Sequence, residues 1–121
     1  MIQVIRRELS TMLPLKIHQV SFEDPSLSIQ GQSWSLNAIC CWRLATPKTL
    51  VASPEALGRL GELSGDSIVS VQSQSRVSSY DPAFECASGM WIELFTDHWT
   101  DPWVMHLPHV TLVGSGSEIA E

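Results

Sequence analysis

The side chains best suited to chemistry gather near the C-terminus, where carboxylates and imidazoles share one short stretch: Asp97, His98, Asp101, His106 and His109. Such groups are ligands of zinc and related ions. In a strand, however, side chains three positions apart point to opposite faces, and Pro108 interrupts any helix that would align His106 with His109. A metal site at His98, His106 and His109 therefore requires a loop that brings them together. The alternative is that these residues lie on the surface or cap backbone groups.

Other catalytic chemistry has little support in the sequence. The chain contains no GxSxG nucleophile turn, no GxxxxGK[ST] phosphate loop and no GxGxxG dinucleotide motif. Cys40, Cys41 and Cys86 make an odd number in mostly apolar surroundings, so we expect reduced, buried thiols rather than disulfides. We therefore expect no cofactor, and we favour a non-enzymatic role over catalysis.

Tryptophan is the other unusual feature, with five residues: Trp34, Trp42, Trp91, Trp99 and Trp103. Trp34 and Trp91 fall at strand spacing, which favours a place in the core. Trp99 and Trp103 lie in a stretch rich in Asp and Pro, which predicts a loop. An exposed aromatic ring surrounded by carboxylates would anchor a basic partner. The alternative is a loop that folds onto the sheet as a lid.

Arg43 and a polar loop complete the predicted binding surface. Arg43 follows Trp42 in an apolar run, and we expect it to have a carboxylate partner, because a buried, unpaired guanidinium is costly. Residues 74–83 are the most polar stretch and predict a loop that contains Tyr80. The predicted binding residues are Asp97, Trp99, Asp101, Trp103, Tyr80 and Arg43.

Periodicity predicts the elements that must position these residues. Apolar residues at helical spacing predict a first helix that ends before Pro14: Ile2, Ile5, Leu9, Met12 and Leu13. A second, short helix is expected between Ser53 and Gly65. Strands are predicted over residues 15–22, with an irregularity near Gln19, and over 27–29, 33–38, 49–52, 68–71, 84–86, 90–95, 103–107 and 110–113. Residues 39–44 lose the alternation and indicate a strand that is covered on both faces or crosses into a bend.

These elements predict an α+β fold that is mainly antiparallel β with two short helices, in a single domain over residues 1–121. An internal repeat relates residues 2–53 to 54–115, followed by a flexible tail at 116–121. Under this alignment Ile17 matches Ile68, both Asp-Pro turns match, and Thr49 matches Thr111. Each half alone would leave an apolar face uncovered, so we expect a pseudo-twofold domain in which the two halves pack together.

Composition limits the partners. With 121 residues, of which 44% are hydrophobic and 17% charged, the chain suits one globular domain. The net charge of −6 argues against nucleic-acid binding, which needs clustered Lys and Arg, and it permits a basic protein partner. No apolar run approaches the ~20 residues of a membrane helix, and the N-terminus lacks a signal-peptide core, so we expect a cytoplasmic protein without membrane contact.

Short motifs also resemble a known set of proteins. They are Trp42, Arg43 and Leu44 after a hairpin; Leu63, Gly65, Ile68 and Val71; Phe95, Thr96 and Asp97; and Trp103 with residues 111–116. In this order they resemble a large set of small bacterial proteins of unknown function, some of which are similar to immunity proteins that neutralise toxins of competing bacteria. The resemblance implies a fold and no catalytic activity.

Three hypotheses for function follow. The first is a non-enzymatic protein that binds another protein, as a toxin-neutralising immunity factor would. The second is a small-molecule or metal-binding domain that uses the cleft between the two halves near His98, His106 and His109. The third is a homodimeric scaffold that pairs through an exposed edge strand.

Overall fold

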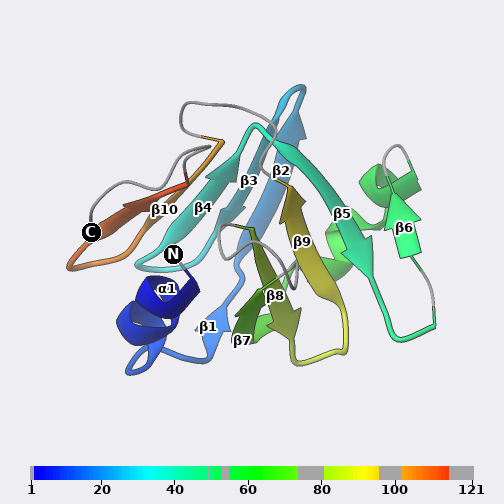
Figure 1. Cartoon of the computed structure of the whole chain (residues 1–121). Helices are drawn as coiled ribbons and strands as arrows, with labels where there is room; N and C mark the ends of the chain where they lie inside the picture. Colours follow the sequence, from blue (N-terminus) through cyan, green and yellow to red (C-terminus); the bar gives the residue numbers. More distant parts are fainter. Residues whose placement is uncertain (1, 49, 53–54, 74–80, 96–101, 115–121) are drawn as a thin grey trace.

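The computed structural model describes residues 2–48, 50–52, 55–73, 81–95 and 102–114. These residues form two antiparallel sheets, one α-helix and one 3₁₀ helix (Figure 1). The expectation of a mainly antiparallel β protein with two short helices, consistent with an α+β fold, is confirmed. In the described part of the chain, neither helix has the length and apolar character needed to cross a membrane.

The larger sheet, called sheet A below, has six strands. Their order across the sheet is β1 (Leu15–Lys16), β7 (Ser67–Ser73), β8 (Pro82–Cys86), β9 (Trp91–Phe95), β5 (Cys41–Ala45) and β6 (Leu50–Ala52). The smaller one, sheet B, has five strands in the order β11 (Thr111–Val113), β10 (Trp103–His106), β4 (Ser35–Ala38), β3 (Ser26–Gln30) and β2 (Gln19–Glu23). The predicted loop over 74–83 is therefore too long at its C-terminal end, because β8 starts at Pro82.

The chain passes between the sheets at two bends that the sequence had marked. After β1, the Ile17 N–H donates to the Asp66 carbonyl (2.9 Å), and the next N–H, of His18, donates to the Gln30 carbonyl in β3 (2.8 Å). Between β4 and β5, the N–H groups of Ile39 and Cys40 both donate to the Pro102 carbonyl, just before β10. The second of the two interpretations of residues 39–44, a crossing into a bend, is the observed one.

Each sheet is a composite, because β4 of sheet B is followed by β5 of sheet A, and β9 of sheet A is followed by β10 of sheet B. Strands β2, β3 and β4 form a meander to which β10 adds beside β4, and β7, β8 and β9 form a meander to which β5 adds beside β9. Neither sheet is therefore built from one continuous piece of chain.

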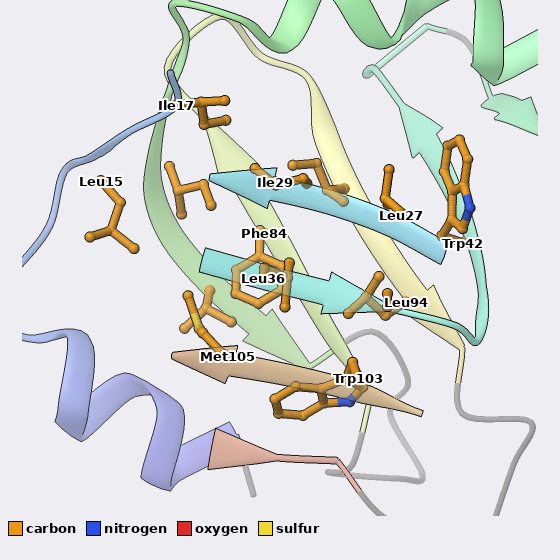
Figure 2. Close-up of a cluster of buried hydrophobic side chains, with 14 of the residues drawn as sticks. Leu15, Ile17, Leu27, Ile29, Leu36, Trp42, Phe84, Leu94, Trp103 and Met105 are labelled. Atoms are coloured by element: carbon orange, nitrogen blue, oxygen red, sulfur yellow. The ribbon is translucent and has the colours of Figure 1, made fainter. Parts of the chain in front are cut away.

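The core lies between the two sheets (Figure 2). On sheet B, Ile29 pairs with Leu36, which pairs with Met105, and all three side chains are almost fully buried. On sheet A, Phe84 pairs with Ile92, which is also fully buried. Alternate residues point inward because side chains alternate across a strand. Each buried side chain of this size stabilises the fold by about 1.5–3 kcal/mol.

Two glycines make room for core tryptophans. The Trp34 indole Nε1 donates to the Lys16 carbonyl (3.1 Å), and a Cβ on Gly31 would lie 1.9 Å from that nitrogen. Likewise, a Cβ on Gly114 would lie 2.3 Å from Nε1 of Trp103. Any larger residue at either glycine would displace a buried indole, so both positions require glycine for packing.

Both helices are shorter or tighter than the sequence predicted. Helix α1 (Ile2–Leu9) buries Ile2, Ile5 and Leu9, but it ends at Leu9 instead of continuing to Leu13. The second helix, η1 (Glu55–Leu63), is a 3₁₀ helix, consistent with two glycines that weaken α-helical propensity. It is followed by Gly65 at a φ of 89°, the left-handed conformation expected of the predicted C-terminal cap.

Candidate functional site

Five of the predicted site residues lie outside the described part of the chain: Tyr80, Asp97, His98, Trp99 and Asp101. The structure therefore places Arg43, Trp103, His106 and His109. These four do not form one site: Trp103 is buried, and the side chains of His106, His109 and Arg43 contact three different partners.

Trp103 lies in the core, so the expectation that it anchors a partner from an exposed loop is wrong. It begins strand β10, has a relative exposure of 0% and points into the space between the sheets (Figure 2). Its cross-strand neighbour is Ala38, whose small side chain leaves room for the indole. The Asp- and Pro-rich context suggested a loop, but the alternation with inward-facing Met105 is what decided the position of the ring.

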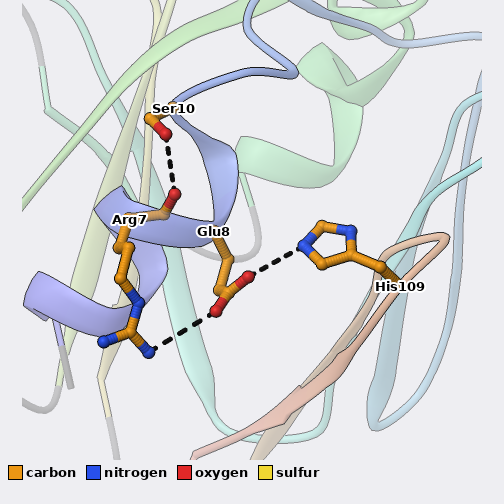
Figure 3. Close-up of polar contacts among 4 residues, drawn as sticks. All are labelled: Arg7, Glu8, Ser10 and His109. Atoms are coloured by element: carbon orange, nitrogen blue, oxygen red, sulfur yellow. Dashed lines mark hydrogen bonds and ion pairs between the residues drawn. The ribbon is translucent and has the colours of Figure 1, made fainter.

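His106 and His109 point to different partners. His106 Nδ1 lies 3.2 Å from Thr111 Oγ1 on the solvent face of sheet B. His109 Nε2 lies 2.8 Å from Glu8 Oε2 on helix α1 (Figure 3). Within the described residues, no group of three or more His, Cys, Asp or Glu side chains could hold a metal ion. The described structure thus gives the proposed metal site no ligand set.

The Glu8 contact has a structural role instead. The hydrogen bond from His109 is the main reason that the pKa of Glu8 lies below its usual value, and Arg7 adds a weaker contact at 3.4 Å. On the neighbouring turn of α1, Arg6 Nε donates to the Val71 carbonyl of β7 (2.9 Å). Helix α1 is therefore tied to sheet A through Arg6 and to the β10–β11 turn of sheet B through Glu8.

Arg43 has the carboxylate partner that the sequence predicted. Arg43 on β5 lies directly opposite Glu93 on β9, and its Nε donates to Glu93 Oε1. The guanidinium carbon also lies 4.9 Å from the centre of the Phe95 ring. The side chains are 33% and 17% exposed, so the ion pair is half-buried and held in place by the aromatic ring.

Trp91 extends this arrangement, and its expected place in the core is wrong. Its neighbour Ile92 is fully buried in the core, so Trp91 points to the outer face of sheet A, where it is half-buried. Across the sheet it lies between Ala45 on β5 and Glu85 on β8. Ser70 Oγ donates to Glu85 Oε1 (2.8 Å). Two aromatic rings, Trp91 and Phe95, thus share this face with Arg43, Glu85 and Glu93.

A shallow hollow of about 310 Å³ opens beside Trp91. Its lining consists of small, polar and aromatic side chains: Ala45, Thr46, Pro47, Gln72, Ser73, Ala83, Trp91 and Glu93. Ala45 and Ala83 are buried but do not belong to the core between the sheets. They lie opposite Trp91 and Glu93 respectively, so they form the floor of the hollow on the outer face.

Comparisons with models of known protein families, with curated proteins and with solved structures give no match.

The outer face of sheet B has a different character. Its residues are polar and mostly uncharged: they include Ser21, Ser28, Asn37 and Gln30, together with Glu23 and His106. Ser28 Oγ donates to Asn37 Oδ1 (2.7 Å), which satisfies two of these groups within the sheet. A second hollow of about 310 Å³ lies at the end of this sheet, between residues 30–35 and His106. Trp34 lines it, but that indole is almost fully buried and already hydrogen-bonded.

The cysteines separate into two environments. Cys40 and Cys86 are buried, as expected, whereas Cys41 is exposed, which corrects the expectation that all three are packed thiols. Burial, together with repulsion by the charges of Asp66 and Glu85, raises the pKa of Cys86 to about 12. The Cys86 thiol is therefore protonated at neutral pH and has no nucleophilic character.

Three residues of this face were not predicted as site residues: Trp91, Glu93 and Gln72. The signal was present for the first two, because Trp91, Glu93 and Phe95 alternate with Ile92 and Leu94. An aromatic residue that shares a strand face with a carboxylate is expected on the solvent side. Gln72 enters the site only through the pairing of β7 with β8 opposite Ala83.

Proposed function

We propose that this chain is a non-enzymatic domain that binds another protein through the outer face of sheet A. One observation carries the proposal: Trp91 is partly exposed beside an ordered Arg43–Glu93 pair that lies on Phe95. Tryptophan and arginine are the residue types most enriched among side chains that dominate binding energy at protein interfaces. The folded core does not require them on this face.

The order of this surface supports the proposal. Arg43 is held by a hydrogen bond and by an aromatic ring before any partner arrives. A side chain that is already fixed loses less conformational entropy on binding, so more of the contact energy appears as affinity. The equivalent side of sheet B offers short hydroxyl and amide groups, some of which already bond to each other.

A biological role follows from the resemblance to small bacterial proteins. We propose a cytoplasmic immunity-like factor that neutralises a toxin by forming a one-to-one complex with it. The net charge of −6 favours a basic partner, and such a complex weakens as salt screens the charges.

We also propose that residues 2–53 and 54–115 are copies of one ancestral unit related by a pseudo-twofold axis. Two junctions between the halves support this. Where β10 pairs with β4, Trp103 lies opposite Ala38 and Met105 opposite Leu36. Where β5 pairs with β9, Trp42 lies opposite Leu94 and Leu44 opposite Ile92. In both, a strand with an inward tryptophan as its first or second residue joins the last strand of the other half's meander. The two halves, produced as separate chains, should remain unfolded alone and regain the native circular dichroism spectrum when mixed. Folding of either half alone would contradict this arrangement.

The test of the function uses the protein encoded beside this chain in its source genome. The two proteins are mixed, and the mass of the complex is measured by light scattering after gel filtration. We expect a one-to-one complex that the double variant Trp91→Ala, Phe95→Ala weakens. The matched control, Ser21→Ala with Ser28→Ala on sheet B, should bind like the original chain.

Three outcomes would contradict the proposal. One is that the sheet A variant binds as well as the control. Another is that the two proteins do not associate at low salt. The third is that the chain alone has twice its monomer mass and loses this mass with the sheet A variant, which would identify the face as a homodimer interface.

A further inference from the structure

We propose that the hollow beside Trp91 receives a basic side chain, lysine or arginine, from the partner protein. This inference rests on the proposed function and names the chemistry of the partner group that reaches the centre of the interface. Glu93 and Trp91, both of which line the hollow, are the groups that recognise it.

The shape of the hollow follows from two alanines. Ala45 and Ala83 occupy outward positions on β5 and β8. A longer side chain at either position would fill the hollow. Pro47, on the β5–β6 connection, forms an apolar wall. An alkyl chain fits this floor and wall, because lysine and arginine bury their methylene groups against apolar surface and keep the charged end near polar groups.

The second carboxylate oxygen of Glu93 suits a cationic donor. Glu93 lines the hollow, and Glu85 lies on the far side of Trp91. Two guanidiniums lie near these two carboxylates: Arg43 donates to Glu93, and Arg6 Nη2 donates to Gln72 Oε1 in the lining of the hollow. Arg43 Nε uses Oε1 of Glu93, and a carboxylate has two oxygens that together accept several hydrogen bonds. A second donor from a partner can therefore bind the same carboxylate without displacing Arg43.

Trp91 adds a second reason for a cation. The face of an indole ring is electron-rich and attracts an ammonium or guanidinium group placed over it. The same surface already shows this kind of contact, because the Arg43 guanidinium lies 4.9 Å from the centre of the Phe95 ring. An acidic side chain would meet two carboxylates, and a neutral apolar one would leave Glu93 without a new donor.

The experiment is a titration of the full-length, ¹⁵N-labelled chain with a blocked Gly-Lys-Gly peptide and, separately, a blocked Gly-Arg-Gly peptide. The indole N–H signal of Trp91 is assigned from its loss in Trp91→Phe. We expect a saturable shift of this signal with at least one peptide. The same lysine peptide acetylated on its side chain, which lacks the charge, should cause no saturable shift.

Two variants test the recognising groups. Glu93→Gln keeps an oxygen acceptor for Arg43 and should weaken peptide binding by about two- to fivefold. Glu23→Gln removes the same charge from an exposed position on sheet B and should leave binding unchanged. Trp91→Leu keeps an apolar side chain but lacks the ring, and it should weaken binding by a similar factor, read from amide signals of Ala83. The amide spectrum of each variant shows whether it is folded.

Three results would overturn the inference: equal binding of the acetylated peptide, equal losses with Glu23→Gln and Glu93→Gln, or no saturable shift with either basic peptide. The two proposals fail separately. If Glu93→Gln leaves the affinity for the protein partner unchanged, only the basic side chain is rejected. If the peptides bind in the hollow but no protein complex forms, only the proposed function is rejected.

Discussion

The outer faces of the two sheets differ, although their inner faces are alike. Both inner faces consist of alternating Leu, Ile, Trp and Met or Phe side chains that share one core. Outside, sheet B carries short uncharged groups such as Ser28 and Asn37, whereas sheet A carries Trp91 and the Arg43–Glu93 pair. The inner faces are constrained by packing and the outer faces are not. The difference therefore locates the part of the surface that is available for recognition.

The largest expected effect is a loss of stability, and it distinguishes an inward residue of β9 from its outward neighbour. Ile92→Ala empties a fully buried position of β9 and should lower the free energy of unfolding by about 2–5 kcal/mol. Trp91→Ala, one residue away, should cost about 1 kcal/mol or less, because the ring is outside the core. Urea denaturation measures both. Similar losses for the two variants would show that the outer face of sheet A is part of the core.

The next comparison sets a polar pair on sheet A against one on sheet B. Arg43→Ala should lower the free energy of unfolding by about 1–3 kcal/mol, because it leaves the half-buried Glu93 carboxylate without its donor. Ser28→Ala removes the bond to Asn37 and should cost about 0.5–1.5 kcal/mol. Thermal unfolding ranks the two. If Arg43→Ala costs no more than Ser28→Ala, the ion pair contributes no special order to the proposed surface.

The reactivity of the cysteines at alkaline pH tests which of them lies on the outer face of sheet A and which on the inner face. Cys41 is exposed on the outer face opposite Phe95, and Cys86 is 1% exposed on the inner face. Iodoacetamide should modify Cys41 first in the native protein, as peptide mass spectrometry would show.

The raised pKa of Cys86, about 12, stabilises the fold below the unfolded thiol pKa. That contribution should disappear as the pH rises from about 8.5 toward the folded value, and Cys86→Ala should remove this part of the pH dependence.

The smallest effect concerns the link between helix α1 and sheet B. The pKa of Glu8 is lowered in the folded state, mainly by the hydrogen bond from His109. Its contribution is therefore present above the unfolded pKa of about 4.3 and is lost as the pH falls through the lower, folded value. Glu8→Gln should destabilise the protein slightly at neutral pH and not at all in acid. A loss of the same size in acid would mean that the charge of Glu8 has no role in this contact.

Much of the local structure could be predicted from residue types. The alternation in residues 33–38 and 90–95 predicted two strands, and the break in alternation after Ala38 gave a bend, observed at Ile39 and Cys40, as one of two alternatives. The apolar run around Arg43 predicted a carboxylate partner, which proved to be Glu93. These predictions succeeded because they depend on burial and on the period of a strand, which neighbouring residues determine.

The candidate site was less predictable, and the two misplaced tryptophans show why. Trp91 and Trp103 each lie opposite an alanine across the sheet, yet the Trp91 ring is partly exposed and the Trp103 ring is fully buried. Whether each ring faces the core or the solvent follows from the next residue on the same strand face, which is Glu93 for Trp91 and Met105 for Trp103. The Asp- and Pro-rich neighbours of Trp103 suggested an exposed loop, and the strand spacing of Trp91 suggested the core, so both rings were assigned to the wrong side.

By itself, the sequence determined which residues of each strand share a face, because that depends only on the alternation of neighbours along the chain. Only the tertiary structure decided which strands lie side by side, including β5 beside β9 and β10 beside β4. Those pairings join residues about 50 or more positions apart, and many alternative partners would bury similar apolar area. The hollow beside Trp91, which needs three neighbouring strands in register, exists only after that choice has been made.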